Sequence, residues 1–337
     1  MTNKYLILIP IMVLLIISVM TLKQGTNLGT KQLIFCLLSL GLIFVVSKIN
    51  MKWVIKKSIW FYIICNLLLV LVLIIGNETK GAKAWLDLYF FKLQPSELMK
   101  IALLLYLIKL NMSNKNIIFL IIAFLIPSIL TYLEPDTGAI IFYAIILFSC
   151  LIYRNKNKKA LIILAILALL TILGLAFMYI KYQDLFIKIF GTSIFYRIDR
   201  LIGFKEQSNL QLENALISIG SHSFVYFPEY HNDFIFAYIL STNSIFVPLL
   251  ILICFFLIFK YLWQKKNPLS TAILLTLVFQ SFYNMLMNIG LVPIIGIPLP
   301  FVSYGGSYLL SLCILIGMAI NIYNKDNNYM VLHKDSN

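Results

Sequence analysis

The chain has 337 residues, of which 61% are hydrophobic and only 12% are charged, and its mean hydropathy is +0.94. A soluble domain carries about 25% charged residues, so this composition excludes an ordinary soluble protein and indicates a polytopic membrane protein. The net charge of +14 would suit nucleic-acid binding in a soluble protein, but here Lys and Arg lie mainly in short loops between apolar runs. We therefore expect no nucleic-acid partner.

Ten apolar runs approach the length of about 20 residues that a transmembrane helix needs. They lie near residues 5–22, 33–48, 57–76, 97–110, 117–133, 138–153, 160–181, 233–261, 269–291 and 300–323. The first run lacks a small-x-small cleavage site, so we interpret it as a retained span rather than a signal peptide. The sequence thus predicts one all-α polytopic membrane domain over residues 1–337, with about ten transmembrane helices.

The five cysteines all lie inside these apolar runs, without a CxxC motif or a metal-ligand spacing. We expect them to be small buried hydrophobic side chains with no disulfide or metal role.

Basic residues occupy alternate loops, within residues 48–57, 109–115, 154–159 and 260–266. The positive-inside rule makes these loops and both termini cytoplasmic. The opposite loops then face outward, among them residues 77–96 and a large extracellular loop, 182–232, between the seventh and eighth helices. Around Arg197 the loop alternates apolar and basic residues, which suits either a basic amphipathic helix at the outer interface or a surface helix packed on its neighbours.

Charged groups at membrane depth cost about 2.5 kcal/mol or more, so those that remain are candidates for function. In QPSELMK, Pro95 fits the first turn of a helix, and Ser96, Glu97 and Lys100 fall within one turn of each other. Glu97 and Lys100 can therefore form an ion pair. Two interpretations of Lys100 stay open, a side chain that snorkels outward from a plain helix start and a cation that points into an outward cavity.

Two further polar stretches interrupt apolar regions. The sequence TYLEPDTGAIIF, with Glu134 and Asp136, is either a plain turn between spans or part of a functional site. The sequence FQSFYNMLMNIG places Gln280, Asn284 and Asn288 at i,i+4 steps on one helix face, where interhelical hydrogen bonds would explain them without a substrate.

In GIPLPFVSYGGSYLL, two prolines precede a pair of glycines. Non-helical backbone is expected around Pro298 and Pro300, which a membrane protein tolerates where protein or a water-filled cavity supplies hydrogen-bond partners.

The stretch PEYHNDF places Glu229, His231 and Asp233 at two-residue intervals before an apolar run. Three interpretations compete. Asn232 or Asp233 caps the following helix, the triplet binds a divalent metal ion, or one partly desolvated carboxylate acts as a general base.

Five features together resemble one family: KGAKAWLDLYFFKLQPSELMK, EPDTGA, PEYHNDFIFA, NIGLVPIIGIPLPFVSYGGS and the plan of ten spans with both ends inside. They resemble the SEDS proteins, whose best-known members are RodA and FtsW, and WLDLYFFKLQPSELMK is closer to the RodA branch. The resemblance implies a multi-pass protein of the bacterial cytoplasmic membrane that polymerises peptidoglycan strands from lipid II at the outer face. The sugar 4-hydroxyl of one precursor would attack the anomeric carbon of another and expel undecaprenyl pyrophosphate with inversion.

The resemblance also assigns roles to residues. Asp233 takes the essential acidic position and is the candidate base, and Lys100 would steady the pyrophosphate or tune a neighbouring carboxylate. The other candidate substrate-binding residues are Trp85, Gln94, Ser96, Glu97, Asp136, Arg197, Glu229, His231, Ser303 and Tyr304. No cofactor or metal ligand is assigned, although Mg²⁺ or Mn²⁺ remains an alternative. The implied partners are a class B penicillin-binding protein and other elongation or division machinery.

The chain departs from the family pattern at several positions. Ala84 stands where Arg usually precedes the Trp, Asn232 replaces Thr, the glycine-rich run before PEYHND is missing, and YILSTNS follows DFIFA. Two alternatives to the polymerase stay open, a flippase or transporter of lipid-linked precursors and a non-catalytic scaffold for the transpeptidase. A flippase needs a charged path to the cytoplasmic side, whereas the polar clusters here gather at the outer face.

Overall fold

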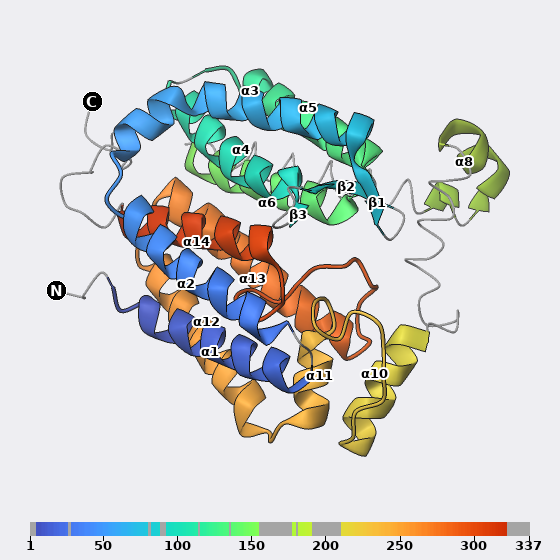
Figure 1. Cartoon of the computed structure of the whole chain (residues 1–337). Helices are drawn as coiled ribbons and strands as arrows, with labels where there is room; N and C mark the ends of the chain where they lie inside the picture. The colour runs from blue at the N-terminus through green and yellow to red at the C-terminus, as the bar shows by residue number, and fades with distance from the viewer. Residues whose placement is uncertain are drawn as a thin grey trace.

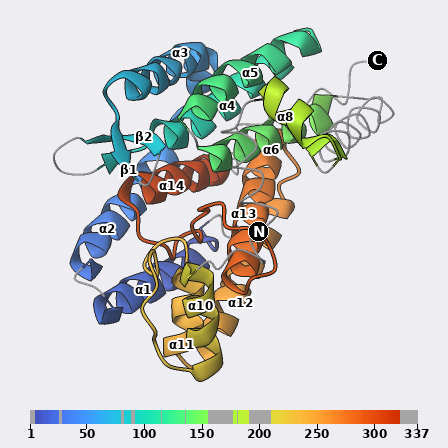
Figure 2. The ribbon, with the colours of Figure 1, turned by 90° about the vertical axis from the view of Figure 1, so that its right-hand side faces the viewer.

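The computed structural model describes residues 5–25, 28–79, 82–87, 92–113, 115–134, 136–154, 177–179, 181–190 and 210–321. Helices dominate these residues: α1 (Leu8–Gly25), α2 (Gly29–Val46), α3 (Met51–Ile75), α4 (Pro95–Met112), α5 (Ile117–Leu133), α6 (Thr137–Arg154), α8 (Gln183–Phe190), α10 (Leu210–Ser221), α11 (Ile235–Thr242), α12 (Phe246–Trp263), α13 (Pro268–Asn288) and α14 (Gly306–Asn321). Helices α3 to α6 form one group, and α1, α2 and α12 to α14 lie beside it (Figures 1 and 2).

Within the described residues, four helices are long and apolar enough to cross a membrane: α2, α3, α12 and α13. Helices α1, α5, α6 and α14 contain apolar stretches slightly shorter than these: Leu8–Gln24, Ile117–Leu133, Thr137–Tyr153 and Gly306–Asn321. The chain is therefore a multi-pass membrane protein, as the composition indicates. The expected span at 160–181 lies almost entirely outside the described residues.

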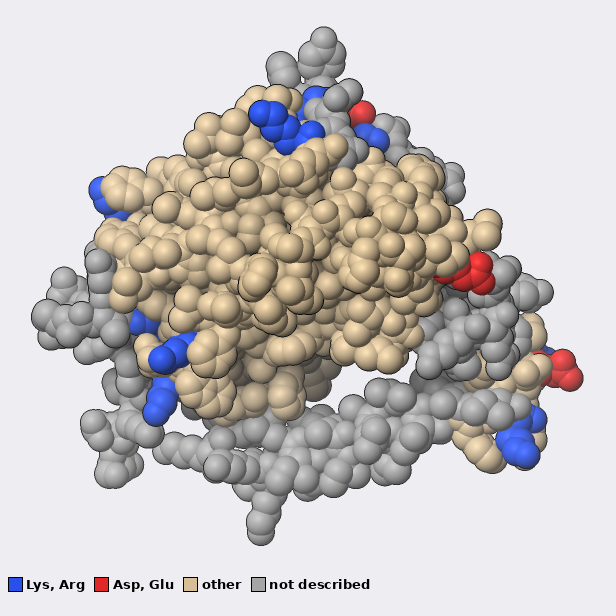
Figure 3. All heavy atoms as spheres, turned by 90° about the horizontal axis from the view of Figure 1, so that it is seen from below, with Lys and Arg blue, Asp and Glu red and all other residues tan. Residues whose placement is uncertain are grey.

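The surface fits this assignment. Only 28% of the residues in the apolar stretch of α3 are buried inside the protein. The helix exposes large side chains such as Trp60, Leu67 and Ile74. Figure 3 shows a broad face without charged side chains, and Lys, Arg, Asp and Glu lie around its edges. Such a band is suited to contact with lipid tails, since charge is costly there.

Helices α2 and α14 pack closely because Gly317 has no side chain. A Cβ atom at Gly317 would lie 2.8 Å from the Cβ of Val46 and 3.0 Å from the carbonyl oxygen of Ile43. Asn321, at the end of α14, donates to the backbone carbonyls of Val46 (3.0 Å) and Ile49 (2.6 Å). The end of α14 thus meets the turn between α2 and α3. All five cysteines are free and buried, as expected.

Long-range hydrogen bonds bring the helix ends that border the basic loops to one end of the bundle. Lys109, near the end of α4, donates to a carbonyl in the second turn of α3 (2.9 Å). Asn111 donates to a carbonyl near the end of α6 (3.1 Å), and the Tyr153 hydroxyl of α6 lies 2.9 Å from that of Thr271 at the start of α13. The starts of α4 and α6 consequently lie at the opposite end.

The all-α prediction is wrong in one place, because the loop between α3 and α4 contains a small antiparallel sheet. It consists of β1 (Asn77–Thr79), β2 (Ala82–Asp87) and β3 (Lys92–Leu93), in that order. Along β2, Ala84 and Leu86 are buried while Trp85 and Asp87 are not. This alternation with a period of two is typical of a half-buried strand and is too short to stand out beside helical runs.

The expected span at 233–261 is wrong as well, because it is two helices. Helix α11 ends at Thr242, Asn243 is extended (φ −115°, ψ 161°), and α12 begins at Phe246. The hydroxyls of Ser241 and Thr242 both donate to the carbonyl of Tyr238 (2.9 and 2.7 Å). Such side-chain bonds compete with the helical ladder, which accounts for the break within the polar sequence STNS.

Candidate functional site

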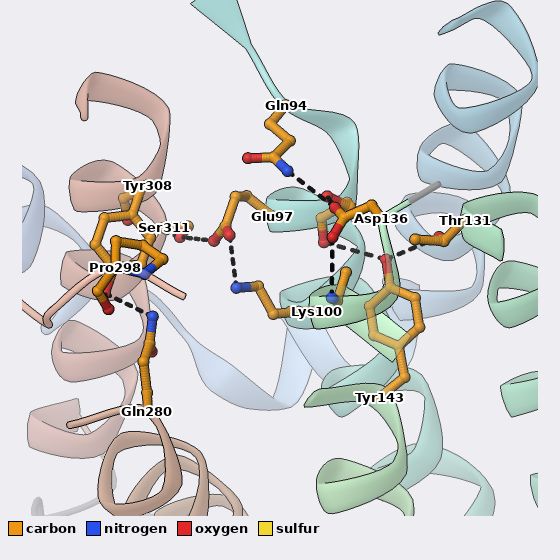
Figure 4. A network of polar contacts seen from close by, with 12 residues as sticks. Gln94, Glu97, Lys100, Thr131, Asp136, Tyr143, Gln280, Pro298, Tyr308 and Ser311 are labelled. Carbon is orange, nitrogen blue, oxygen red and sulfur yellow. Dashed lines mark hydrogen bonds and ion pairs between the residues drawn. The ribbon is translucent and has the colours of Figure 1, made fainter. Parts of the chain in front are cut away.

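A buried ion pair lies in the first turns of α4, where QPSELMK begins the helix with Pro95 at its N-terminus. The ammonium of Lys100 lies 2.7 Å from Oε1 of Glu97, which confirms the predicted pair. The Ser311 hydroxyl of α14 donates to the other carboxylate oxygen of Glu97 (2.8 Å). Figure 4 shows Glu97 between Lys100 and Ser311, so this pair joins the two helix groups.

Lys100 is buried rather than snorkelling, since only 5% of its side chain is exposed. Its ammonium lies 4.5 Å from the ring centroid of Phe142 and 6.0 Å from that of Tyr308. The interpretation of a plain helix start with an outward Lys100 is therefore wrong. In this arrangement the charge of Lys100 is balanced first by Glu97.

Asp136 connects the end of the loop between α3 and α4 to the start of α6. Its Oδ2 accepts from Gln94 (2.9 Å) and from the Ser96 hydroxyl (2.8 Å), and its Oδ1 accepts from the backbone N–H of Ala139 (3.1 Å). The hydroxyl of Tyr143 donates to the carbonyl of Ser96 (3.2 Å). EPDTGA is thus a turn between helices whose carboxylate also fixes the start of α4 (Figure 4).

Glu134 is a second carboxyl group in this turn, and it is fully buried just after the last residue of α5. Neither of its carboxyl oxygens has a hydrogen-bond partner among the described residues. Burial and the nearby charge of Asp136 raise the pKa of Glu134 to about 8. We therefore expect Glu134 to be protonated at neutral pH in the folded protein.

The turn containing PEYHND lies directly before α11. The N-cap of α11 is Phe234, which makes no side-chain capping bond. The predicted cap at Asn232 or Asp233 thus lies one or two residues before the N-cap residue of α11. Glu229 begins the turn with a φ of +60°, and its carbonyl accepts the N–H groups of Asn232 (2.9 Å) and Phe234 (3.1 Å).

The loop before α14 holds this turn from the other side. Residues 292–299 contain no regular helix, as the two prolines predict. The Ser303 hydroxyl donates to the carbonyl of Asn232 (2.7 Å), and the N–H of Tyr304 donates to that of His231 (3.1 Å). The rings of His231 and Tyr304 lie edge to face with centroids 6.2 Å apart. Burial raises the pKa of the Tyr304 hydroxyl above its ordinary value.

The three amides of α13 make long-range hydrogen bonds, as their shared face predicts. Gln280 donates to the Tyr308 hydroxyl (2.6 Å), which in turn donates to the carbonyl of Pro298 (3.3 Å; Figure 4). Asn284 and Asn288 both donate to the backbone carbonyl of Asp233 (2.8 and 2.9 Å). Sequence reasoning did not connect these two amides with Asp233, because their spacing indicates a shared face but not a partner.

The sequence-predicted residues thus form two clusters. The α4 cluster contains Gln94, Ser96, Glu97, Lys100 and Asp136, and the PEYHND cluster contains Glu229, His231, Asp233, Ser303 and Tyr304. Trp85 lies half-buried on β2, which packs against α3 and α4. Arg197 lies outside the described residues. Tyr308 lies between the clusters, since its ring centroid is 6.0 Å from the ammonium of Lys100 and its hydroxyl donates to the carbonyl of Pro298 in the loop before α14.

The side chains of the PEYHND triplet do not gather into a group with metal-ligand geometry. Among the described residues, no three His, Cys, Asp or Glu side chains come close enough together to hold a metal ion. What this cluster offers chemically is a half-buried carboxylate on a turn whose backbone is fixed at several points, which suits a general base.

Comparison of the sequence with known proteins identifies relatives from one family. Residues 2–328 match the family model FtsW/RodA/SpoVE, described as cell cycle protein. The probable peptidoglycan glycosyltransferase FtsW of Wigglesworthia glossinidia brevipalpis is 30% identical over 361 residues, covering 94% of this chain and 90% of that protein. The peptidoglycan glycosyltransferase MrdB of Escherichia coli (strain K12) is 28% identical over 356 residues, covering 94% and 92%. These values favour neither the FtsW nor the RodA branch.

The fold of this chain resembles that of solved structures. A chain from work described as "Structural coordination of polymerization and crosslinking by a peptidoglycan synthase complex" superposes with a TM-score of 0.79 at 21% identity, covering 95% of this chain and 98% of that one. Rod shape determining protein RodA of Thermus thermophilus gives a TM-score of 0.68 at 22% identity, covering 96% and 97%.

Proposed function

We propose, because the chain belongs to the cell cycle protein family of FtsW, RodA and SpoVE, that it is a peptidoglycan glycosyltransferase that polymerises lipid II. Relatives that span nearly its whole length carry the name peptidoglycan glycosyltransferase. The observation that carries the assignment to a site is the half-buried Asp233 on the PEYHND turn, which the loop before α14 and the amides of α13 hold in place.

In this proposal Asp233 accepts the proton of the sugar 4-hydroxyl as that oxygen attacks the anomeric carbon of a second lipid-linked disaccharide. The bond from that carbon to undecaprenyl pyrophosphate breaks, and the configuration inverts. A base raises the nucleophilicity of the hydroxyl, and positive charge stabilises the departing pyrophosphate. Lys100 would stabilise the pyrophosphate while paired with Glu97. The neighbouring side chains of the α4 cluster would contact the substrate: Gln94, Ser96, Glu97 and Asp136.

The proposed orientation has ten spans, both termini in the cytoplasm and the two clusters at the outer face of the bacterial cytoplasmic membrane. The hydrogen bonds that gather the helix ends bordering the basic loops at one end of the bundle support this orientation. The α4 cluster lies at the starts of α4 and α6, at the other end, and the PEYHND cluster lies against the loop before α14. This separation disfavours a flippase, which needs polar groups along the whole path.

The proposed partner is a class B penicillin-binding protein that crosslinks the new strands, together with other elongation or division machinery. It is supported by the fold shared with a chain of a peptidoglycan synthase complex. A scaffold role without catalysis remains the second candidate, because Ala84 replaces the usual Arg and is buried on β2.

Purified protein supplied with lipid II tests the proposal. We expect the wild type to form glycan polymer and Asp233→Asn to form at least 100-fold less. Glu213→Gln is the matched control, because Glu213 is an exposed carboxylate on α10. Each sample contains Mg²⁺ or Mn²⁺, which pyrophosphate binds, and is measured with and without the partner. Wild-type protein that makes no polymer in any of these conditions would leave the scaffold role as the better account.

A further inference from the structure

The backbone of the PEYHND turn accepts hydrogen bonds at three successive carbonyls. Tyr304 and Ser303 bind the carbonyls of His231 and Asn232, and both belong to the loop before α14. The third carbonyl, that of Asp233, accepts from Asn284 (2.8 Å) and Asn288 (2.9 Å) together. In the described part of the turn, only this carbonyl receives two side-chain amides, and both come from α13.

Asn288 has a second contact with the same segment. Its Oδ1 accepts the backbone N–H of Ala237 (2.8 Å), in the first turn of α11. The first N–H groups of a helix have no partner within the helix and usually bind an N-cap side chain. Since the N-cap residue Phe234 supplies none, Asn288 caps α11 from another helix. The same side chain therefore fixes Asp233 and the start of the helix that follows it.

Asn284 connects Asp233 to the segment that faces its carboxylate. Its Nδ2 also donates to the carbonyl of Ile297 (2.7 Å), and the preceding residue is Gly296. A Cβ atom at Gly296 would lie 3.3 Å from Oδ2 of Asp233, and Gly296 has a φ of +68°, which an L side chain rarely adopts. Gly296 thus leaves the space that the carboxylate fills, and Asn284 holds both sides of that space together.

We infer that Asn284 and Asn288 are positioning residues for Asp233, and that Gly296 sets the room available to its carboxylate. This inference rests on the proposed function, in which Asp233 is the base. Both asparagines are fully buried. A base acts only within hydrogen-bond reach of its proton, and a misplacement of about 1 Å costs roughly 100-fold in rate. The amides of α13 therefore act on the reaction through Asp233, without touching the substrate.

The test measures lipid II polymerisation by Asn284→Ala and Asn288→Ala in purified protein, with kcat, KM and melting temperature determined on the same samples. We expect kcat to fall about 10- to 100-fold while KM stays within about twofold. Ser281→Ala is the matched control, because Ser281 is a buried polar residue of α13 whose hydroxyl bonds only within its own helix in the described structure. Its kcat should stay within about twofold of wild type.

Two further variants separate positioning from loss of folding. Gly296→Ala removes no hydrogen bond, yet it should lower kcat about tenfold or more by crowding the Asp233 carboxylate. In an Asp233→Glu background, Asn288→Ala should lower the remaining kcat less than threefold. The longer side chain already displaces the carboxylate from the position that Asn288 fixes.

A kcat within twofold of wild type in both asparagine variants would overturn the inference, as would an increase in KM at unchanged kcat. If the asparagine variants do not fold, an unchanged kcat in Gly296→Ala overturns it. A wild type that makes no polymer overturns the proposed function and this inference with it, whereas an active wild type with fully active variants overturns the inference alone.

Discussion

Replacing Lys100 by Met should destabilise the protein strongly, because it leaves the Glu97 carboxylate buried without its counter-ion. The two side chains are 5% and 10% exposed, and their charged atoms lie 2.7 Å apart. After the change, Glu97 would retain the neutral Ser311 hydroxyl as its recorded donor. Removing one partner of a buried ion pair costs about 3–5 kcal/mol, so we expect a loss of that size in the free energy of unfolding.

The double variant Glu97→Gln with Lys100→Met isolates the cause. It removes both charges, and the amide oxygen of a glutamine can still accept from Ser311, so we expect a loss below about 2 kcal/mol. Since Glu97→Gln alone also breaks the pair and should cost about 3–5 kcal/mol, the two single changes would be coupled by at least about 4 kcal/mol, which a double-mutant cycle measures. Unfolding curves in mixed detergent micelles supply the free energies.

The reasoning would be refuted if Lys100→Met lost less than about 1 kcal/mol, or if the double variant were less stable than both single variants. Polymerisation of lipid II by the same samples adds a second result. A double variant that recovers both stability and activity assigns Lys100 to the fold. One that recovers stability alone assigns its charge to the reaction.

Three further predictions concern Glu134, Gly317 and Asp136. Glu134 keeps its proton up to a pKa of about 8 when folded but ionises near 4.5 when unfolded, so stability should fall by roughly 3 kcal/mol between pH 5 and 7.5 and then level off above pH 8. Glu134→Gln should flatten this dependence in unfolding curves, and an unchanged slope would contradict it. Gly317→Ala should cost about 1–3 kcal/mol, because its Cβ would lie 2.8 Å from that of Val46; a melting temperature equal to wild type would refute that contact. Asp136→Ala should cost about 2 kcal/mol, since Gln94, Ser96 and the Ala139 N–H lose their acceptor, whereas Asp136→Asn should cost less; equal melting temperatures for the two variants would contradict this.

The sequence by itself determined the features that depend on neighbouring residues. Composition established a multi-pass membrane protein, and the i,i+3 spacing of Glu97 and Lys100 predicted their ion pair. The i,i+4 spacing of the amides on α13 predicted hydrogen bonds to other segments, and the prolines of GIPLP predicted non-helical backbone. Each of these follows from helical geometry or backbone chemistry within a few residues.

Only the tertiary structure decided which segments meet. Asn288 reaches the carbonyl of Asp233 across 55 positions, Ser303 reaches that of Asn232 across 71, and Gln94 reaches Asp136 across 42. Local signals favoured a cap at Asn232 or Asp233, whereas the N-cap residue is Phe234 and Asn288 binds the first turn of α11 from α13. Local signals also favoured one long helix, and this prediction is wrong because side-chain bonds end α11 at Thr242. Periodicity specifies which face a residue occupies, but the partner of that face depends on how the helices pack, and packing is a property of the whole chain.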